Sequence, residues 1–185
     1  MLKILFTYPE LVPDEITLIS NFLSGDWDYL HIKKPRQSKL EIENLIELIP
    51  TELHKKLVLH EHFDLAEHFD LAGVAVNKKN LQEVTDREDI MSYSAHTIEE
   101  IKELNINPKY VFLSPIYDSI SKKGYGSAFS DLKTLKSDLH KLEHTIVALG
   151  GVTLDKRNEL REIGFKGYAM LGGIWEEHLQ LRDWR

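Results

Sequence analysis

The strongest constraint on the fold is a unit that recurs along the chain: a short apolar run rich in β-forming residues, followed in most cases by a stretch with helical spacing. Strands that alternate with single helices pair in parallel through right-handed crossovers, and eight such units close into a (β/α)8 barrel of the α/β class. A doubly wound open sheet is the rival, although it usually has fewer strands. The expected strands are 2–8, 29–33, 57–60, 73–77, 90–94, 110–114, 145–150 and 167–171.

The chain has 185 residues, which gives each unit about 23 residues, enough for a strand, a helix and two short loops. We therefore expect one compact domain over 1–185. The connection 78–88 has the weakest helical pattern. Asp14, Thr97, Ser130 and Thr153 are expected helix N-caps, and Gly164 a C-cap. The expected helices are 15–23, 40–48, 65–69, 98–104, 132–142 and 154–163.

Charge and cysteine content exclude several function classes. Lys plus Arg number 23 and Asp plus Glu 30, a net charge of −7 that argues against nonspecific nucleic-acid binding. The absence of cysteine excludes disulfides, thiolate metal sites and a cysteine nucleophile. No apolar run is long enough to span a membrane and no signal-peptide layout is present, so we expect a cytoplasmic protein without a membrane partner. The sequence leaves a homo-oligomer open.

Two glycine pairs follow the last two expected strands. Gly150-Gly151 and Gly172-Gly173 let backbone N–H groups approach a phosphate without obstruction by side chains, at the place where barrels of this kind bind phosphate. Tight turns are the alternative explanation. The segment 119–126 adds Ser119, Ser121 and Lys122, which suit an anion-binding lid, although a solvated basic loop would have the same composition.

His31, His60 and His96 end three different strands, so they face the same end of the barrel. Three inward histidines are able to ligate zinc, as in a metallohydrolase, but scattered imidazoles more often make ordinary hydrogen bonds. Trp175 and Trp184 are expected to pack the last helix. The remaining histidines are expected on helical surfaces; they are His54, His68, His140, His144 and His178.

Four motifs occur in order: Ser94-Ala95-His96-Thr97, the Ser-x-Ser-Lys-Lys-Gly loop at 119–124, Ala-Leu-Gly-Gly-Val-Thr at 148–153, and Gly-Tyr-Ala-Met-Leu-Gly at 167–172. In these motifs the chain resembles the thiamine phosphate synthase and thiazole tautomerase family, whose fold is a (β/α)8 barrel. The resemblance covers the chain from its second strand onward. It implies a thiazole phosphate on Gly150, Gly151 and Gly172, and a loop carrying Ser119, Ser121 and Lys122 that closes over the diphosphate.

The first half departs from the family pattern. Where the synthase has Gln-x-Arg-x-Lys for a diphosphate, this chain has His-Ile-Lys-Lys-Pro at 31–35, and where it has Asn-Asp, this chain has His60-Glu61. The second magnesium-binding aspartate aligns with Asn80. Because Mg²⁺ prefers carboxylate oxygens, this neutral amide favours the tautomerase branch, which needs no metal.

We therefore predict a thiamine-biosynthesis barrel enzyme that shifts a proton on a phosphorylated thiazole without a cofactor. The alternative is the synthase, which joins a pyrimidine methyl diphosphate to a thiazole phosphate and uses Mg²⁺. A zinc hydrolase and a noncatalytic ligand-binding barrel are lesser alternatives. Glu61 is the candidate metal ligand. The predicted catalytic residues are His96, Lys122 and His31, with substrate and phosphate binding by Lys33, His60, Ser94, Ser119, Ser121, Gly150, Gly151, Gly172 and Gly173.

Overall fold

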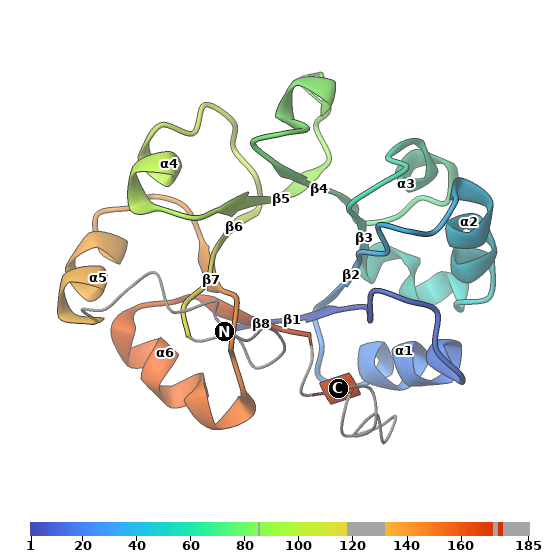
Figure 1. The fold of residues 1–185 in the computed structure, drawn as a ribbon, viewed down its shortest axis with the longest axis horizontal. Coiled ribbons are helices and arrows are strands. Elements are labelled where there is room, and N and C mark those ends of the chain that lie inside the picture. Colours follow the sequence, from blue (N-terminus) through green and yellow to red (C-terminus); the bar gives the residue numbers. More distant parts are fainter. Residues whose placement is uncertain (85, 118–131, 172–173, 176–185) are drawn as a thin grey trace.

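The structure is a computed structural model that describes residues 1–84, 86–117, 132–171 and 174–175. Eight parallel strands close into a barrel in the order β1 to β8, with β8 pairing back onto β1. The helices form a ring outside the strands (Figure 1). This closure confirms the (β/α)8 prediction and excludes the open sheet. The strands are β1 Leu2–Phe6, β2 Tyr29–Ile32, β3 Leu57–Leu59, β4 Gly73–Asn77, β5 Ile90–Ala95, β6 Tyr110–Leu113, β7 Ile146–Ala148 and β8 Gly167–Met170.

Some of the connections contain shorter or less regular helices than the sequence predicts. In the described part of 78–88, where the sequence predicts a weak helix, the helical segment is the 3₁₀ turn Leu81–Val84, and two more 3₁₀ segments lie at Thr51–Lys56 and Leu154–Lys156. No helix in the described parts of the chain is long and apolar enough to cross a membrane. The α-helices are α1 Glu15–Ser24, α2 Lys39–Glu47, α3 Asp64–His68, α4 Ile98–Lys102, α5 Leu132–Leu139 and α6 Arg157–Ile163.

The predicted helix caps are correct at some positions and wrong at others. The Thr97 side chain accepts a hydrogen bond from the Glu100 N–H, and Gly164 ends α6 with φ 116°, as expected. Asp14 instead has a left-handed backbone, φ 56°, and no side-chain cap bond. Thr153 precedes a 3₁₀ turn and its hydroxyl donates to Asp155 rather than accepting from the backbone. Ser130 lies outside the described residues.

Two apolar layers hold the barrel together. The larger one packs the outward faces of the strands against the helices, and it includes Ile19, Leu45 and Trp175. Trp175 also donates from Nε1 to the carbonyl oxygen of Phe6 at 2.7 Å, which confirms its packing role; Trp184 lies outside the described residues. The smaller layer fills the barrel interior and consists of Ile4, Phe6, Val58, Ala75, Met91, Tyr110, Phe112, Val147 and Ala169.

His54 corrects the expectation that it lies on a helical surface. Its ring is buried, and Nε2 lies 3.2 Å from the carbonyl oxygen of Ile46 and 3.0 Å from that of Ile49. His54 therefore satisfies backbone carbonyls between α2 and the following turn. His68 and His140 are exposed as expected, His144 is half-buried, and His178 lies outside the described residues.

Candidate active site

Polar side chains collect where the strands end, because all eight parallel strands end at the same mouth of the barrel. One group follows β2 and β3 and contains Lys33, His60 and Glu61. The other follows β5 and β6 and contains His96 with the carbonyl of Ser114.

The first group places one cation beside an imidazole and a carboxyl. The Lys33 N–H donates to Thr7 Oγ1 at 3.0 Å, which fixes the end of β2 against β1. Burial, and then the positive charge of Lys33, lower the pKa of His60 to about 3. Burial raises the pKa of Glu61, and a hydrogen bond from the Lys34 backbone and the charge of Lys33 oppose this shift. His60 is therefore neutral at pH 7, and Lys33 supplies the positive charge in this group.

His31 lies beneath this group, inside the barrel. It is fully buried, with Nδ1 2.9 Å from His60 Nε2 and Nε2 2.6 Å from the Tyr110 hydroxyl. Burial, and then the electrostatic influence of His60 and of the Lys33 charge, moves its pKa well below the ordinary range. We predicted His31 as a catalytic residue, but both of its ring nitrogens are already bonded and neither reaches solvent. This position favours a supporting role for His31 behind His60.

Lys34, the neighbour of Lys33, is a structural residue. Its ammonium lies 2.8 Å from Glu15 Oε1 and donates to the carbonyl oxygens of Tyr8 at 2.9 Å and Glu10 at 2.7 Å. Burial raises the pKa of Glu15 and lowers that of Lys34, while their mutual attraction opposes both shifts. The pair therefore ties the segment after β1 to the end of β2 and to the start of α1.

The second group orients His96. Its Nδ1 lies 2.9 Å from the Ser114 carbonyl oxygen, which accepts and therefore requires a proton on Nδ1. In the neutral ring, Nε2 then carries a lone pair and is able to accept a proton. The side chain is exposed at the mouth.

Glu100 holds the backbone of His96 and was missed by the sequence analysis. Its Oε2 accepts from the His96 N–H at 2.9 Å, and its Oε1 accepts from the Tyr93 hydroxyl at 2.7 Å. Burial opposes the charged form, but these two hydrogen bonds keep the pKa of Glu100 below its usual value. The spacing Thr97-x-x-Glu100, typical of a capping box, was the available signal.

The turn after β7 needs glycine for structural reasons. Gly150 has φ 91° and Gly151 φ 63°, and a Cβ on Gly150 would lie 2.8 Å from Pro115 Cα. The Gly150 carbonyl oxygen also accepts from the Tyr117 N–H at 3.1 Å. The tight-turn explanation therefore holds for Gly150, and phosphate binding by this pair remains a prediction.

The structure describes Ser94 and Asn80 but not five other residues that the sequence analysis named. Ser94 is half-buried on β5, where it pairs in register with Asn77 and Phe112. Asn80 is bound within its own turn, since its Oδ1 accepts from the Asn77 N–H at 2.8 Å. Outside the described residues lie Ser119, Ser121, Lys122, Gly172 and Gly173.

The zinc alternative lacks a ligand set. Among the residues that the structure describes, no three His, Asp or Glu side chains come together closely enough to hold a metal. His31 and His60 bond to each other, and His96 bonds to the Ser114 carbonyl. The three histidines therefore make ordinary hydrogen bonds.

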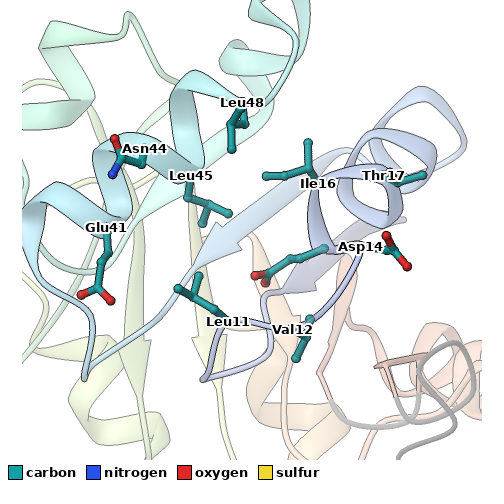
Figure 2. Close-up of a pocket in the computed structure, with 10 residues that line it drawn as sticks. Leu11, Val12, Asp14, Ile16, Thr17, Glu41, Asn44, Leu45 and Leu48 are labelled. Carbon is teal, nitrogen blue, oxygen red and sulfur yellow. The ribbon is translucent and has the colours of Figure 1, made fainter.

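Two surface pockets lie near the strand connections. One, of 470 Å³, lies between α1 and α2 and is lined by Leu11, Ile16, Asn44 and Leu48 among others, none of them a predicted site residue (Figure 2). The other, of 420 Å³, is lined by Tyr93, Thr97, Glu100 and neighbouring residues. This second pocket lies beside the hydrogen bonds that hold His96.

Comparison with known proteins settles the family. The model of a family described as thiamine monophosphate synthase matches residues 6–174. The chain belongs to this family. Thiamine monophosphate synthases are transferases of thiamine biosynthesis, so the expected enzyme class and pathway are confirmed at the level of the family.

Individual thiamine-phosphate synthases support the assignment. The Clostridium acetobutylicum protein is 32% identical over 94 residues, and this alignment spans 50% of the chain but only 44% of that relative. The Methanobrevibacter smithii protein is 24% identical over 170 residues, 87% of this chain and 80% of the relative. A thiamine phosphate pyrophosphorylase structure from Bacteroides thetaiotaomicron has a TM-score of 0.82 and 32% identity, covering 95% of this chain and 85% of the other.

Proposed function

We propose that this protein is a thiamine-phosphate synthase, which joins a pyrimidine methyl diphosphate to a thiazole phosphate and releases diphosphate. The observation that carries the proposal is the similarity to the Bacteroides thetaiotaomicron pyrophosphorylase, at 32% identity across 95% of this chain. This reverses the order expected from the sequence, where Asn80 favoured the tautomerase. The tautomerase becomes the second candidate, supported by the hydrogen bond that keeps Asn80 within its own turn.

The first group of mouth residues suits the diphosphate. Lys33 contributes a cation after β2, and His60 lies beside it as a neutral imidazole. Charge-assisted hydrogen bonds to phosphate oxygens are short and strong, so Lys33 would bind the diphosphate and stabilise it as it leaves. In this reaction a bond forms between the thiazole ring and the pyrimidine methyl carbon, while the bond from that carbon to the diphosphate oxygen breaks.

The described residues would hold a magnesium ion only together with the phosphates of a bound substrate. The described residues form no all-protein cage for a metal, but Mg²⁺ is commonly held by one or two carboxylates together with substrate phosphates and water. Glu61 follows directly after His60 and is the carboxylate that would hold it. When bound, the ion would neutralise charge on the leaving diphosphate.

The second group suits the thiazole side of the site. His96 has its Nδ1 fixed by the Ser114 carbonyl, which leaves Nε2 to exchange a proton. Gly150, Gly151 and Gly172 are proposed to bind the thiazole phosphate through their backbone N–H groups, as the family resemblance implies, and Gly173 is proposed to join them. The loop residues Ser119, Ser121 and Lys122 are proposed to bind the diphosphate.

An assay with omitted components tests the proposal. The purified chain is incubated with the pyrimidine methyl diphosphate, the thiazole phosphate and Mg²⁺, and thiamine phosphate and diphosphate are both quantified. We expect the two products in equal amounts, and neither when one substrate is left out. Failure to form thiamine phosphate with all components present would contradict the proposal.

A further inference from the structure

Three side chains form a hydrogen-bonded row inside the barrel: Tyr110 on β6, His31 on β2 and His60 at the end of β3. The Tyr110 hydroxyl lies 2.6 Å from His31 Nε2, and His31 Nδ1 lies 2.9 Å from His60 Nε2. Tyr110 and His31 are fully buried, whereas His60 is half-buried at the mouth. The row therefore links the barrel interior to the candidate active site.

Aromatic rings enclose the row. Phe6 stacks on His31 with ring centroids 4.9 Å apart, and Phe112 meets His31 edge-on at 5.0 Å. Phe6 also packs against His60 at 5.4 Å. Because these apolar walls exclude water, the polar hydrogens of the buried members must be satisfied within the row.

The protons of the row have one well-satisfied arrangement. Burial raises the pKa of Tyr110 and lowers that of His31, so Tyr110 keeps its hydroxyl proton and His31 carries a single N–H. If Tyr110 donates to His31 Nε2, the single N–H of His31 is on Nδ1 and donates to His60 Nε2. Because His60 Nε2 then accepts, the proton of His60 is on Nδ1. In the reverse direction the Tyr110 hydroxyl would need a second acceptor, and the described residues give it none. A buried unpaired hydroxyl costs free energy, which disfavours the reverse direction.

We propose that Tyr110 and His31 are positioning residues that hold His60 as the neutral tautomer protonated on Nδ1, so that His60 donates a hydrogen bond to an anionic oxygen of the substrate. The proposal deepens the proposed function and rests on it for the identity of the substrate. The His60 backbone N–H donates to the carbonyl oxygen of Ile32 at 3.2 Å, which places His60 next to the residue that precedes Lys33. A neutral donor beside a cation suits a phosphate oxygen, which only accepts hydrogen bonds.

Nitrogen-15 NMR of the histidine side chains in the 185-residue chain tests the proposal without turnover, because each tautomer has its own pair of nitrogen shifts. We expect His60 to be protonated on Nδ1 in the unmodified protein, and to become a mixture of tautomers in Tyr110→Phe, which keeps the ring and removes the hydroxyl. Tyr29→Phe is the matched control. Its hydroxyl accepts from Lys109 and makes no hydrogen bond to the row, whereas its ring, which Tyr29→Phe keeps, packs against the ring of Tyr110 at 5.9 Å.

Binding of inorganic pyrophosphate gives a second readout. We expect saturating pyrophosphate to shift the His60 Nδ1 resonance, and Tyr110→Phe to weaken binding about three- to tenfold, the value of one neutral hydrogen bond, while Tyr29→Phe leaves it unchanged. His60 protonated on Nε2 in the unmodified protein, or an unchanged tautomer in Tyr110→Phe, would overturn the proposal. An Nδ1-protonated His60 in a protein that makes no thiamine phosphate would instead refute the proposed function and leave this inference standing.

Discussion

His31 Nδ1 lies 2.9 Å from His60 Nε2, so two histidines that end neighbouring segments of the sheet share one hydrogen bond at the base of the mouth. Both are neutral in the folded protein, because burial lowers the pKa of His60 to about 3 and that of His31 well below its ordinary value of 6.5. We expect both the stability of the fold and ligand binding to depend on this pair.

The first prediction concerns pH. As the pH falls below 6.5, His31 and His60 become protonated in the unfolded chain but stay neutral in the folded protein. The free energy of unfolding is therefore highest above pH 6.5 and falls toward pH 3. Each histidine contributes a slope approaching about 1.4 kcal/mol per pH unit. Urea unfolding at pH 7, 6 and 5 measures it. His31→Gln should remove one histidine's contribution, about 1.4 kcal/mol per pH unit, from the slope. A free energy of unfolding that does not change from pH 7 to pH 5 would contradict the account.

The second prediction concerns the buried ion pair of Lys34 and Glu15. Lys34→Met leaves the Glu15 carboxylate buried without its partner, and we expect it to lower the free energy of unfolding by about 3 to 5 kcal/mol. Lys55→Met is the control, because its ion pair with Asp70 is exposed, and it should cost less than about 1 kcal/mol. An equal decrease of the free energy of unfolding in the two variants would show that the buried pair of Lys34 and Glu15 contributes no more to stability than an exposed pair.

The third prediction concerns the turn after β7. Gly150→Ala adds a Cβ that would lie under 3 Å from Pro115, and alanine would have to adopt the positive φ of 91° that Gly150 has, so the substitution should destabilise the protein by at least about 2 kcal/mol. Gly25→Ala is the matched control, since its nearest neighbours would lie 3.4 Å from the new Cβ, and it should change stability by less than about 1 kcal/mol. Chemical unfolding distinguishes the two, and an unaffected Gly150→Ala would refute the packing explanation.

The fourth prediction concerns the cation at the end of β2. Lys33→Gln removes a charge-assisted hydrogen bond to the diphosphate, and we expect the KM for the pyrimidine methyl diphosphate to rise about tenfold or more. Lys55→Gln, far from the mouth on an exposed pair, should leave KM unchanged. If steady-state kinetics gave Lys33→Gln an unaltered KM, the diphosphate would have to bind elsewhere.

The strands could be predicted because a parallel barrel buries both faces of each strand, which leaves apolar runs in the sequence. The strand Gly73–Asn77 was predicted to the residue, and β7, bounded by Ile146 and Ala148, was merely too long. Helix N-caps were less predictable: Asp14 is a residue type that favours N-caps, but its backbone is left-handed and its side chain makes no cap hydrogen bond. His54 was predicted on a surface because helical spacing alone does not show that its ring will contact the backbone carbonyls of Ile46 and Ile49 in the folded protein.

Site residues could be predicted where their position at the end of a strand is enough to place them at the mouth of the barrel. His60 and His96 lie at the mouth as expected, because every parallel strand ends there. Tyr110 was not identified, since a tyrosine at the start of an apolar strand gives no sign of the histidine it will meet across the barrel. Lys33 was named as a binding residue and is exposed, but the buried ion pair of its neighbour Lys34 with Glu15 was not predicted.

The most direct test of the central claim compares two reactions in one preparation. The rate of thiamine phosphate formation from both substrates with Mg²⁺ is measured beside the rate of the proton shift on the carboxylated thiazole phosphate alone, each with and without a chelator. We predict magnesium-dependent synthesis that the chelator abolishes and that exceeds the proton shift. A proton shift that survives the chelator, with no thiamine phosphate formed, would contradict the account and establish the tautomerase.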